Sequence, residues 1–186
     1  SNILGEKSIK KPVRKRIDIL YNSNMEIDIS IQNPEERIGF DFEIKEEDET
    51  NTPYLQVGPD FYLMENLKLG TYFQVKDEDN RFKIGLKDRV KINNGIHLSA
   101  GYYPWIYSLS ENKSVEEKNW WVQSEFKYKR LFLDLKYNEV ETSITENSWR
   151  GLLGYQISKP LFIVVGVEEG KDGEKRYIGG FTLKSW

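Results

Sequence analysis

The segment GPDFYLMENLKLGTYFQV, residues 58–75, decides the fold class of this chain. In its second half, apolar Leu67, Leu69 and Phe73 share one phase of a two-residue alternation, and polar or small residues hold the other phase. This period is that of a β-strand, whose successive side chains point to opposite faces of a sheet. We expect a tight turn at residues 64–66, between this strand and the one before it.

The same alternation runs through the rest of the chain and predicts about twelve antiparallel strands without helices. The predicted strands are 14–21, 25–32, 36–45, 53–63, 67–76, 81–92, 96–105, 119–128, 131–138, 148–158, 161–168 and 175–185. A tilted strand needs about 9–11 residues to cross a bilayer, whereas strands of about 5–6 residues are commonest in globular proteins. These long strands favour an all-β, antiparallel transmembrane barrel, and counts of ten or eight strands stay open.

Short and long connections alternate along the chain. Tight turns are expected at 33–35, 64–66, 93–95, 129–130 and 159–160, and longer polar loops at 46–52, 77–80, 106–118, 139–147 and 169–174. The connection at 22–24 is the exception, because it is short where a long loop is due. Turns at one end and loops at the other are typical of outer-membrane barrels. Residues 1–12 are predicted to form a loose N-terminal arm, and residues 13–186 a single barrel domain.

Composition excludes several classes of site. The 186 residues carry a formal charge of −3, so nucleic-acid binding driven by net charge is not expected. The chain has no cysteine and one histidine, which excludes thiolate sites and multi-histidine metal sites. No nucleotide or metal motif is present, so we expect no cofactor and no metal. No secretory signal peptide is visible at the N-terminus, and we expect a mature chain.

Aromatic residues help to decide which face meets lipid. On the apolar face, several of them stand at the strand ends that adjoin the loops: Tyr21, Phe73, Phe82, Tyr102, Trp120, Tyr137, Trp149 and Tyr177. A belt of such rings suits a membrane interface, where one end of the ring is apolar and the other is wet. The alternative is a soluble, lipocalin-like ligand-binding barrel with its apolar face inside.

The opposite face is strongly charged. Two neighbouring strands place a basic track on it: Lys68, Lys76, Arg81, Lys83, Lys87, Arg89 and Lys91. The first three strands place an acidic wall on it: Asp18, Glu26, Asp28, Asp41 and Glu43. We expect these walls to lie a quarter to a third of the circumference apart and to set up a transverse field across a narrow lumen. Alternatively, the charges pair and fill the barrel as a polar core. We expect Lys83 and Lys87 to contribute most to a preference for anions, because both lie in the middle of their strand.

Seven glycines share the polar phase and are predicted to ease closure of the barrel. They are Gly39, Gly58, Gly70, Gly85, Gly101, Gly154 and Gly166.

The segments 58–75, SWRGLLGYQISKPLFIVVGVEE at 148–169 and RYIGGFTLKSW at 176–186 resemble the strand–turn–strand rhythm of small Gram-negative outer-membrane barrels. In size and strand count, the whole chain is similar to the twelve-stranded monomeric porins for acidic oligosaccharides. The resemblance implies an outer-membrane location, a lipid bilayer as surroundings, small polar solutes as partners, and a monomer. With the basic track, it predicts a narrow passive channel for small anionic or zwitterionic solutes. One departure is that Lys184 shares its phase with Trp186, whereas Phe181 and Leu183 hold the other phase.

Two other functions stay open. One is a structural or adhesive barrel whose loops bind a partner. The other is a lipid hydrolase, because outer-membrane lipid hydrolases use an H-x-S pair similar to His97 and Ser99. Here Ile96, Leu98 and Ala100 hold the apolar phase, so the pair is expected to face the lumen and not the lipid. No enzymatic activity is therefore expected.

Overall fold

The structure is a computed structural model that describes residues 15–33, 38–46, 53–64, 67–76 and 79–186. Within these ranges, the side chains of a few residues lie outside the description: Ile38, Pro53, Tyr54, Tyr62, Met64 and Lys76. The predicted arm at 1–12, the loop at 47–52, and most of the turns predicted at 33–35 and 64–66 also lie outside the described residues.

The described residues form thirteen β-strands. They are β1 (Arg16–Asn22), β2 (Ile27–Asn33), β3 (Ile38–Glu46), β4 (Pro53–Met64), β5 (Leu67–Lys76), β6 (Asp79–Asn93), β7 (Ile96–Ser108), β8 (Lys113–Val115), β9 (Lys118–Tyr128), β10 (Leu131–Glu141), β11 (Thr145–Ser158), β12 (Leu161–Glu169) and β13 (Lys175–Lys184). Over the same residues, no helix is long and apolar enough to cross a membrane.

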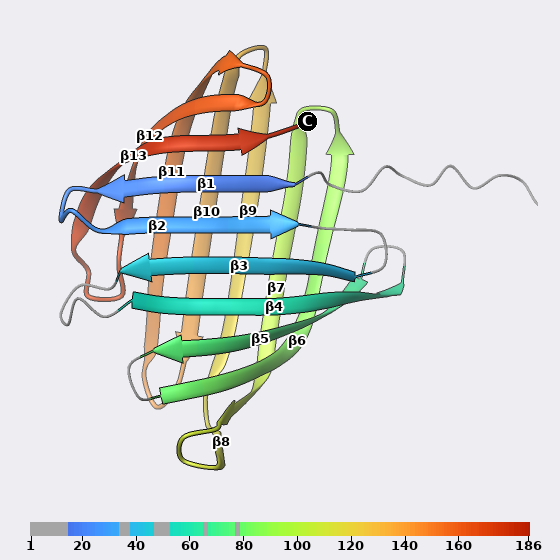
Figure 1. Cartoon of the computed structure of the whole chain (residues 1–186), viewed down its shortest axis with the longest axis vertical. Helices are drawn as coiled ribbons and strands as arrows, with labels where there is room; N and C mark the ends of the chain where they lie inside the picture. The colour runs from blue at the N-terminus through green and yellow to red at the C-terminus, as the bar shows by residue number, and fades with distance from the viewer. Residues whose placement is uncertain (1–14, 34–37, 47–52, 65–66, 77–78) are drawn as a thin grey trace, which may run out of the picture.

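Twelve of these strands close into one antiparallel barrel. Each strand pairs with its neighbour in the chain, β9 pairs with β7, and β1 pairs with β13 to close the circle, with Arg16 opposite Lys184. The remaining strand, β8, pairs only with the far end of β7. In Figure 1 the near wall, β1 to β6, crosses the far wall, β7 and β9 to β12, as tilted strands on opposite sides of a barrel do. The prediction of a twelve-stranded antiparallel barrel is confirmed.

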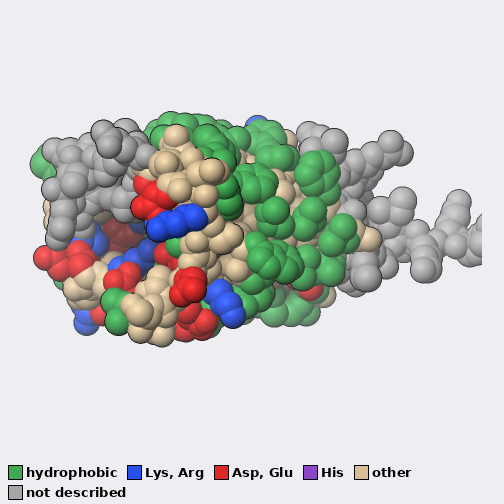
Figure 2. Space-filling view, turned by 90° about the horizontal axis from the view of Figure 1, so that it is seen from below, with side chains coloured by type: hydrophobic (Ala, Val, Ile, Leu, Met, Phe, Trp, Pro, Cys, Tyr) green, Lys and Arg blue, Asp and Glu red, His purple; other side chains and the backbone are tan. Residues whose placement is uncertain are grey.

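The apolar face lies on the outside of this barrel. Leu133, Val165 and Tyr177 point outward with 38%, 58% and 75% of their surface exposed, whereas Asp134 and Thr182 are fully buried inside. Figure 2 shows hydrophobic side chains over the outer wall and charged side chains around the hollow at one end. This arrangement fits a barrel surrounded by lipid, and it is the reverse of what a lipocalin-like barrel requires.

The predicted interface aromatics all lie in strands, but Tyr102 and Tyr137 are in the middle of β7 and β10, because these strands extend further toward the loop end than predicted. Five of them are exposed on the outer face: Tyr21, Phe73, Tyr102, Trp149 and Tyr177. The other three, Phe82, Trp120 and Tyr137, are half-buried. The rings of Trp120 and Tyr137 pack with their centroids 5.2 Å apart, and the indole nitrogen of Trp149 donates to Glu169 at 3.1 Å.

Two of the inward glycines permit a close approach of neighbouring strands. A Cβ atom on Gly58 would lie 1.7 Å from the carbonyl oxygen of Thr71, and one on Gly85 would lie 2.0 Å from that of Tyr102. The pairing register of β6 with β7 shifts beside Gly85. Here the absence of a side chain lets the wall bend, as glycine does in curved sheets.

The predicted loops are longer than the observed ones. Strand β7 continues to Ser108, and β8 lies within the predicted loop 106–118. Strands β10 and β11 pair as far as Glu141 opposite Thr145, which leaves only residues 142–144 as a connection. Met25, predicted to lie in a strand, is in the turn before β2 with a φ of 63°. The strands extend through these polar segments because their backbones can pair. Met25 leaves the strand because the turn requires its positive φ, although its side chain is apolar.

Candidate functional site: a charged lumen

One group of buried charges lies toward the turn end of the lumen, and we call it the Arg16 network: Arg16, Asp18, Glu125, Asp134 and Lys184. The guanidinium of Arg16 pairs with Asp18 at 2.8 Å and also with Glu125 and Asp134, while Lys184 pairs with Glu125. These residues come from β1, β9, β10 and β13, so the network bridges both walls of the barrel. All five side chains are less than a tenth exposed.

Neutral groups complete the hydrogen bonds of this network. The hydroxyl of Thr182 donates to Asp18 at 2.6 Å, and the amide of Gln123 donates to Asp134 at 2.9 Å. Arg150 adds a further cation 3.8 Å from Asp134. Buried charges are costly unless such partners surround them, so these contacts explain how the charges are tolerated inside the wall.

A second group, the Lys87 network, lies on the β3 to β6 side: Asp41, Asp60, Lys68, Lys87 and Arg89. Lys87 pairs with Asp41 and lies 3.4 Å from Asp60, which also binds Lys68 at 3.0 Å. Arg89 lies 3.6 Å from Asp41. Three cations therefore face two carboxylates here.

The structure corrects the expected separation of the two charged walls. Asp41 belongs to the predicted acidic wall, yet it reaches Lys87 and Arg89 of the basic track. The side chains meet because only two strands separate β3 from β6 in the curved wall of the barrel. Asp60, from β4, also enters the track, so Lys68 and Lys87 are ion-paired rather than part of an uninterrupted row of cations.

The rest of the basic track follows the same side of the lumen. Arg81 pairs with Asp79 at 2.7 Å and with Glu117 at 3.1 Å near the loop end. Lys83 and Lys91 are half-buried. Lys76 lies in β5 opposite Asp79, but its side chain is outside the described residues.

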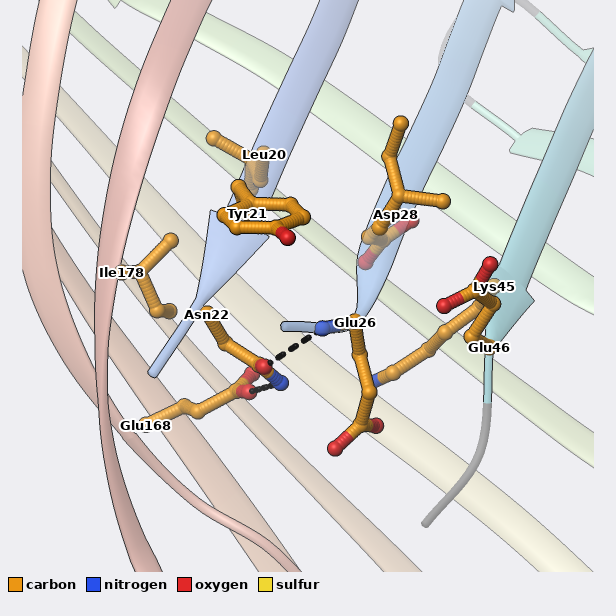
Figure 3. Close-up of a pocket in the computed structure, with 10 residues that line it drawn as sticks. Leu20, Tyr21, Asn22, Glu26, Asp28, Lys45, Glu46, Glu168 and Ile178 are labelled. Carbon is orange, nitrogen blue, oxygen red and sulfur yellow. Dashed lines mark hydrogen bonds between the residues drawn. The ribbon is translucent and has the colours of Figure 1, made fainter. Parts of the chain in front are cut away.

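The rest of the acidic wall lies nearer the loop end. Glu26 and Asp28 line a small hollow together with Asn22, Lys45 and Glu168 (Figure 3). The amide of Asn22 donates to Glu168 at 3.1 Å, and its oxygen accepts from the backbone N–H of Glu26 at 3.0 Å. Glu43 is half-buried on β3. The loop end of the lumen is therefore rich in acids.

His97 and Ser99 face the lumen. The Nδ1 atom of His97 lies 3.0 Å from the ammonium of Lys184, and its ring stacks on Trp186 at 4.5 Å between centroids. Both residues line a second, small hollow, which is also lined by Arg16 and Arg89. The pair is thus held inside a charged network and not presented to lipid.

An apolar cluster on the inner wall was not predicted: Leu20, Phe132, Leu152, Phe162, Val164 and Ile178. Trp186 packs against it. The segments LFL at 131–133, GLLG at 151–154 and LFIVVGV at 161–167 are apolar in both phases, so alternation alone could not divide them between lipid and lumen. The lumen is therefore half charged and half apolar, whereas the sequence predicted a polar wall throughout.

Other inward residues could have been found from their phase. Asp60 shares the phase of Gly58 and Gln56, and Tyr72 shares that of Gly70 and Gln74. The hydroxyl of Tyr72 donates to Asp41 at 2.8 Å, and its ring lies 4.6 Å from the ammonium of Lys87.

No protein-family model matches the chain, and no curated protein matches it either. Solved structures do match. The KdgM porin superposes with a TM-score of 0.67 at 11% identity, over 92% of this chain and 99% of the porin. The chain has the fold of the twelve-stranded monomeric porins.

Two further structures agree with this assignment of the fold. The KdgM porin in complex with disordered oligogalacturonate gives a TM-score of 0.68 at 12% identity, over 92% of this chain and 99% of that porin. The NanC porin gives 0.67 at 9% identity, over 92% of this chain and 100% of that porin. These neighbours are porins and not enzymes. The low identities confine the likeness to the fold.

Proposed function

We propose that the chain is an outer-membrane protein that acts as a narrow passive channel for small anionic or zwitterionic solutes. The observation that carries the proposal is the closed twelve-stranded barrel with an apolar outer belt and charged networks along its lumen. Barrels of about eight strands are filled by side chains and those of sixteen enclose open channels, so twelve strands suit a narrow passage. The loops would then lie outside the cell and the turns in the periplasm, with the chain as a monomer.

The charge pattern supports the class of solute. Among the described residues, the Lys87 network sets three cations beside two carboxylates, and Lys83 and Lys91 lie on the same strand as Lys87. On the other side of the lumen, the hollow at the loop end is acidic because Glu26, Asp28 and Glu168 line it. A lumen with unlike walls orients dipolar solutes and attracts anions to its basic side. The KdgM porin, which has the same fold, is solved in complex with disordered oligogalacturonate.

The hydrolase alternative has less support, because His97 and Ser99 lie inside the lumen and His97 is engaged by Lys184 and Trp186. We expect the variant His97→Ala to fold and to show no loss of phospholipid hydrolysis relative to the original chain, since neither protein should hydrolyse lipid.

The channel is tested with the refolded protein in two assays. In planar bilayers we expect discrete single-channel current steps. In a liposome-swelling assay we expect lactate, an anion, and glycine betaine, a zwitterion, to enter faster than choline, a cation of similar size. Folded protein that passes no current, or that admits choline fastest, would refute the proposed function.

A further inference from the structure

Trp186 lies inside the barrel and not on the lipid face. The backbone N–H of Lys184 makes the last hydrogen bond of β13, to the carbonyl of Pro160 at 3.0 Å, and Lys184 points into the lumen. Trp186 follows two residues later and lies on the same side, where its ring stacks on His97. Its ring also meets the edge of Phe132, with centroids 5.8 Å apart.

Charged groups hold this ring in place. The ammonium of Lys184 lies 4.2 Å from the ring centroid of Trp186, within the range of a cation–π interaction. The same ammonium is anchored by Glu125 and by His97, so the ring is tied to the Arg16 network. The ring also packs against the apolar cluster. The position of Trp186 is thus fixed by both halves of the lumen.

The apolar cluster leaves only part of the lumen for a solute. Phe132, Leu152, Phe162 and Val164 are at most 1% exposed, so their side of the barrel is packed. A polar solute must therefore pass along the charged side, where Arg16, Arg89, His97 and Ser99 line a small hollow. Trp186 lies between the packed side and this hollow, because its ring contacts both Phe132 and His97.

Two polar atoms next to this boundary have no hydrogen-bond partner among the described residues. They are the indole nitrogen of Trp186 and Nε2 of His97, and both are buried. Buried groups of this kind are normally paired with protein or water, so they are suited to bind a solute or its water as it passes.

We propose that Trp186 sets the size limit of the passage at the turn end of the lumen, with His97 and Lys184 as its positioning residues. The inference rests on the proposed channel function and deepens it. It predicts that the indole ring of Trp186, and not the charged residues alone, limits the width of the solutes that can leave the barrel.

The first test compares variants by current and by solute size. In planar bilayers Trp186→Ala should raise the unit conductance and admit larger solutes, while Trp186→Phe should stay close to the original chain because it retains a ring. The matched control is Trp105→Ala, since Trp105 is 66% exposed on the outside of β7. This control should leave conductance unchanged. If Trp186→Ala fails to fold, His97→Ala removes the stacking partner and should widen the passage in the same direction.

The second test needs no current. The chain has no cysteine, so Ser99→Cys introduces a single thiol into the hollow beside His97. We expect a bulky sulfonated thiol reagent to label this residue several-fold faster when Trp186→Ala is added. If Trp186→Ala speeds labelling but no variant carries current, the proposed channel function is wrong, whereas the role of Trp186 as a barrier inside the lumen is supported. Unchanged labelling and unchanged conductance in folded Trp186→Ala would overturn the role of Trp186.

Discussion

At the scale of single residues, the pairing of Lys87 with Asp41 makes a strong prediction. Asp41→Asn removes the charge that Lys87 and Arg89 share, and only Asp60 is left to Lys87 at 3.4 Å. Breaking a buried ion pair typically costs 3–5 kcal/mol, and we expect about 3 kcal/mol here because Asp60 remains. Urea unfolding in lipid vesicles measures the loss.

The matched control for this change is Asp172→Asn. Asp172 pairs with Arg176 at 2.7 Å, but its side chain is 42% exposed in a loop. Exposed pairs contribute about 1 kcal/mol or less, so this variant should unfold almost as the original chain does. Adding Lys87→Met to Asp41→Asn should recover part of the stability, since it removes the unpaired charge. Equal losses in the two single variants would show that the Lys87 network is not buried.

A second prediction at this scale concerns the lipid face. Val165 points outward in the middle of β12, so Val165→Arg places a charge in the hydrocarbon and should cost ~2–4 kcal/mol of folding free energy. Gln156→Arg, on the inner side of β11, should cost much less. Folding measured in detergent or lipid gives both values. The opposite ranking would place the apolar face inside the barrel.

The sequence predicts which residues face the lumen only where polar and apolar residues alternate along a strand. His97 and the acids Asp18 and Asp41 were placed in the lumen by simple alternation, because their strands are polar on one side only. Which charges pair could not be predicted, since Asp41 and Lys87 are 46 residues apart and meet only through the curvature of the wall from β3 to β6. The inner position of Phe132 could not be predicted either, because its strand is apolar on both sides.

At the scale of elements, β8 is dispensable to the barrel and β9 is not. Strand β8 pairs only with the end of β7, where Ser114 is opposite Tyr107. Ser124 of β9 instead pairs with Leu98 on one side and Leu135 on the other. Proline removes a backbone donor, and an unsatisfied backbone group costs several kcal/mol within a bilayer. We therefore expect Ser114→Pro to fold normally and Ser124→Pro to fail, as judged by the heat-dependent gel shift of folded barrels.

The sequence located the strands well because most of them show a period of two and turn residues mark the ends of the others. It missed β8 because Lys113 and Ser114 are polar and the strand is only three residues long. Backbone pairing that extends an existing hairpin does not require apolar side chains. The pairing of β8 depends on the register of β7, so the hydropathy of the sequence does not reveal it. The same reason explains why β10 and β11 run further toward the loop end than predicted.

At the scale of the whole molecule, the proposed channel predicts how selectivity varies with salt. If the positive side of the lumen attracts anions, the reversal potential under a salt gradient should show anion preference at low ionic strength. This preference should fade as salt rises, because the screening length falls from ~10 Å at 0.1 M to ~3 Å at 1 M. Changing Lys83 and Lys91 together to Glu should shift the reversal potential toward cations. Lys87 is unsuitable for this test, since Lys87→Glu would put a third carboxylate beside Asp41 and Asp60.

The controls for this experiment are Lys113→Glu and Lys171→Glu, because both residues lie exposed near the loop end and outside the barrel wall. They should change the reversal potential far less than the lumen pair does. If the variant with Glu at both Lys83 and Lys91 keeps the reversal potential of the original chain, these lysines only fill the interior of the barrel. A charge that no ion passes cannot select between ions. A preference that persists at 1 M salt would instead point to direct binding at short range, where screening by mobile ions has little effect.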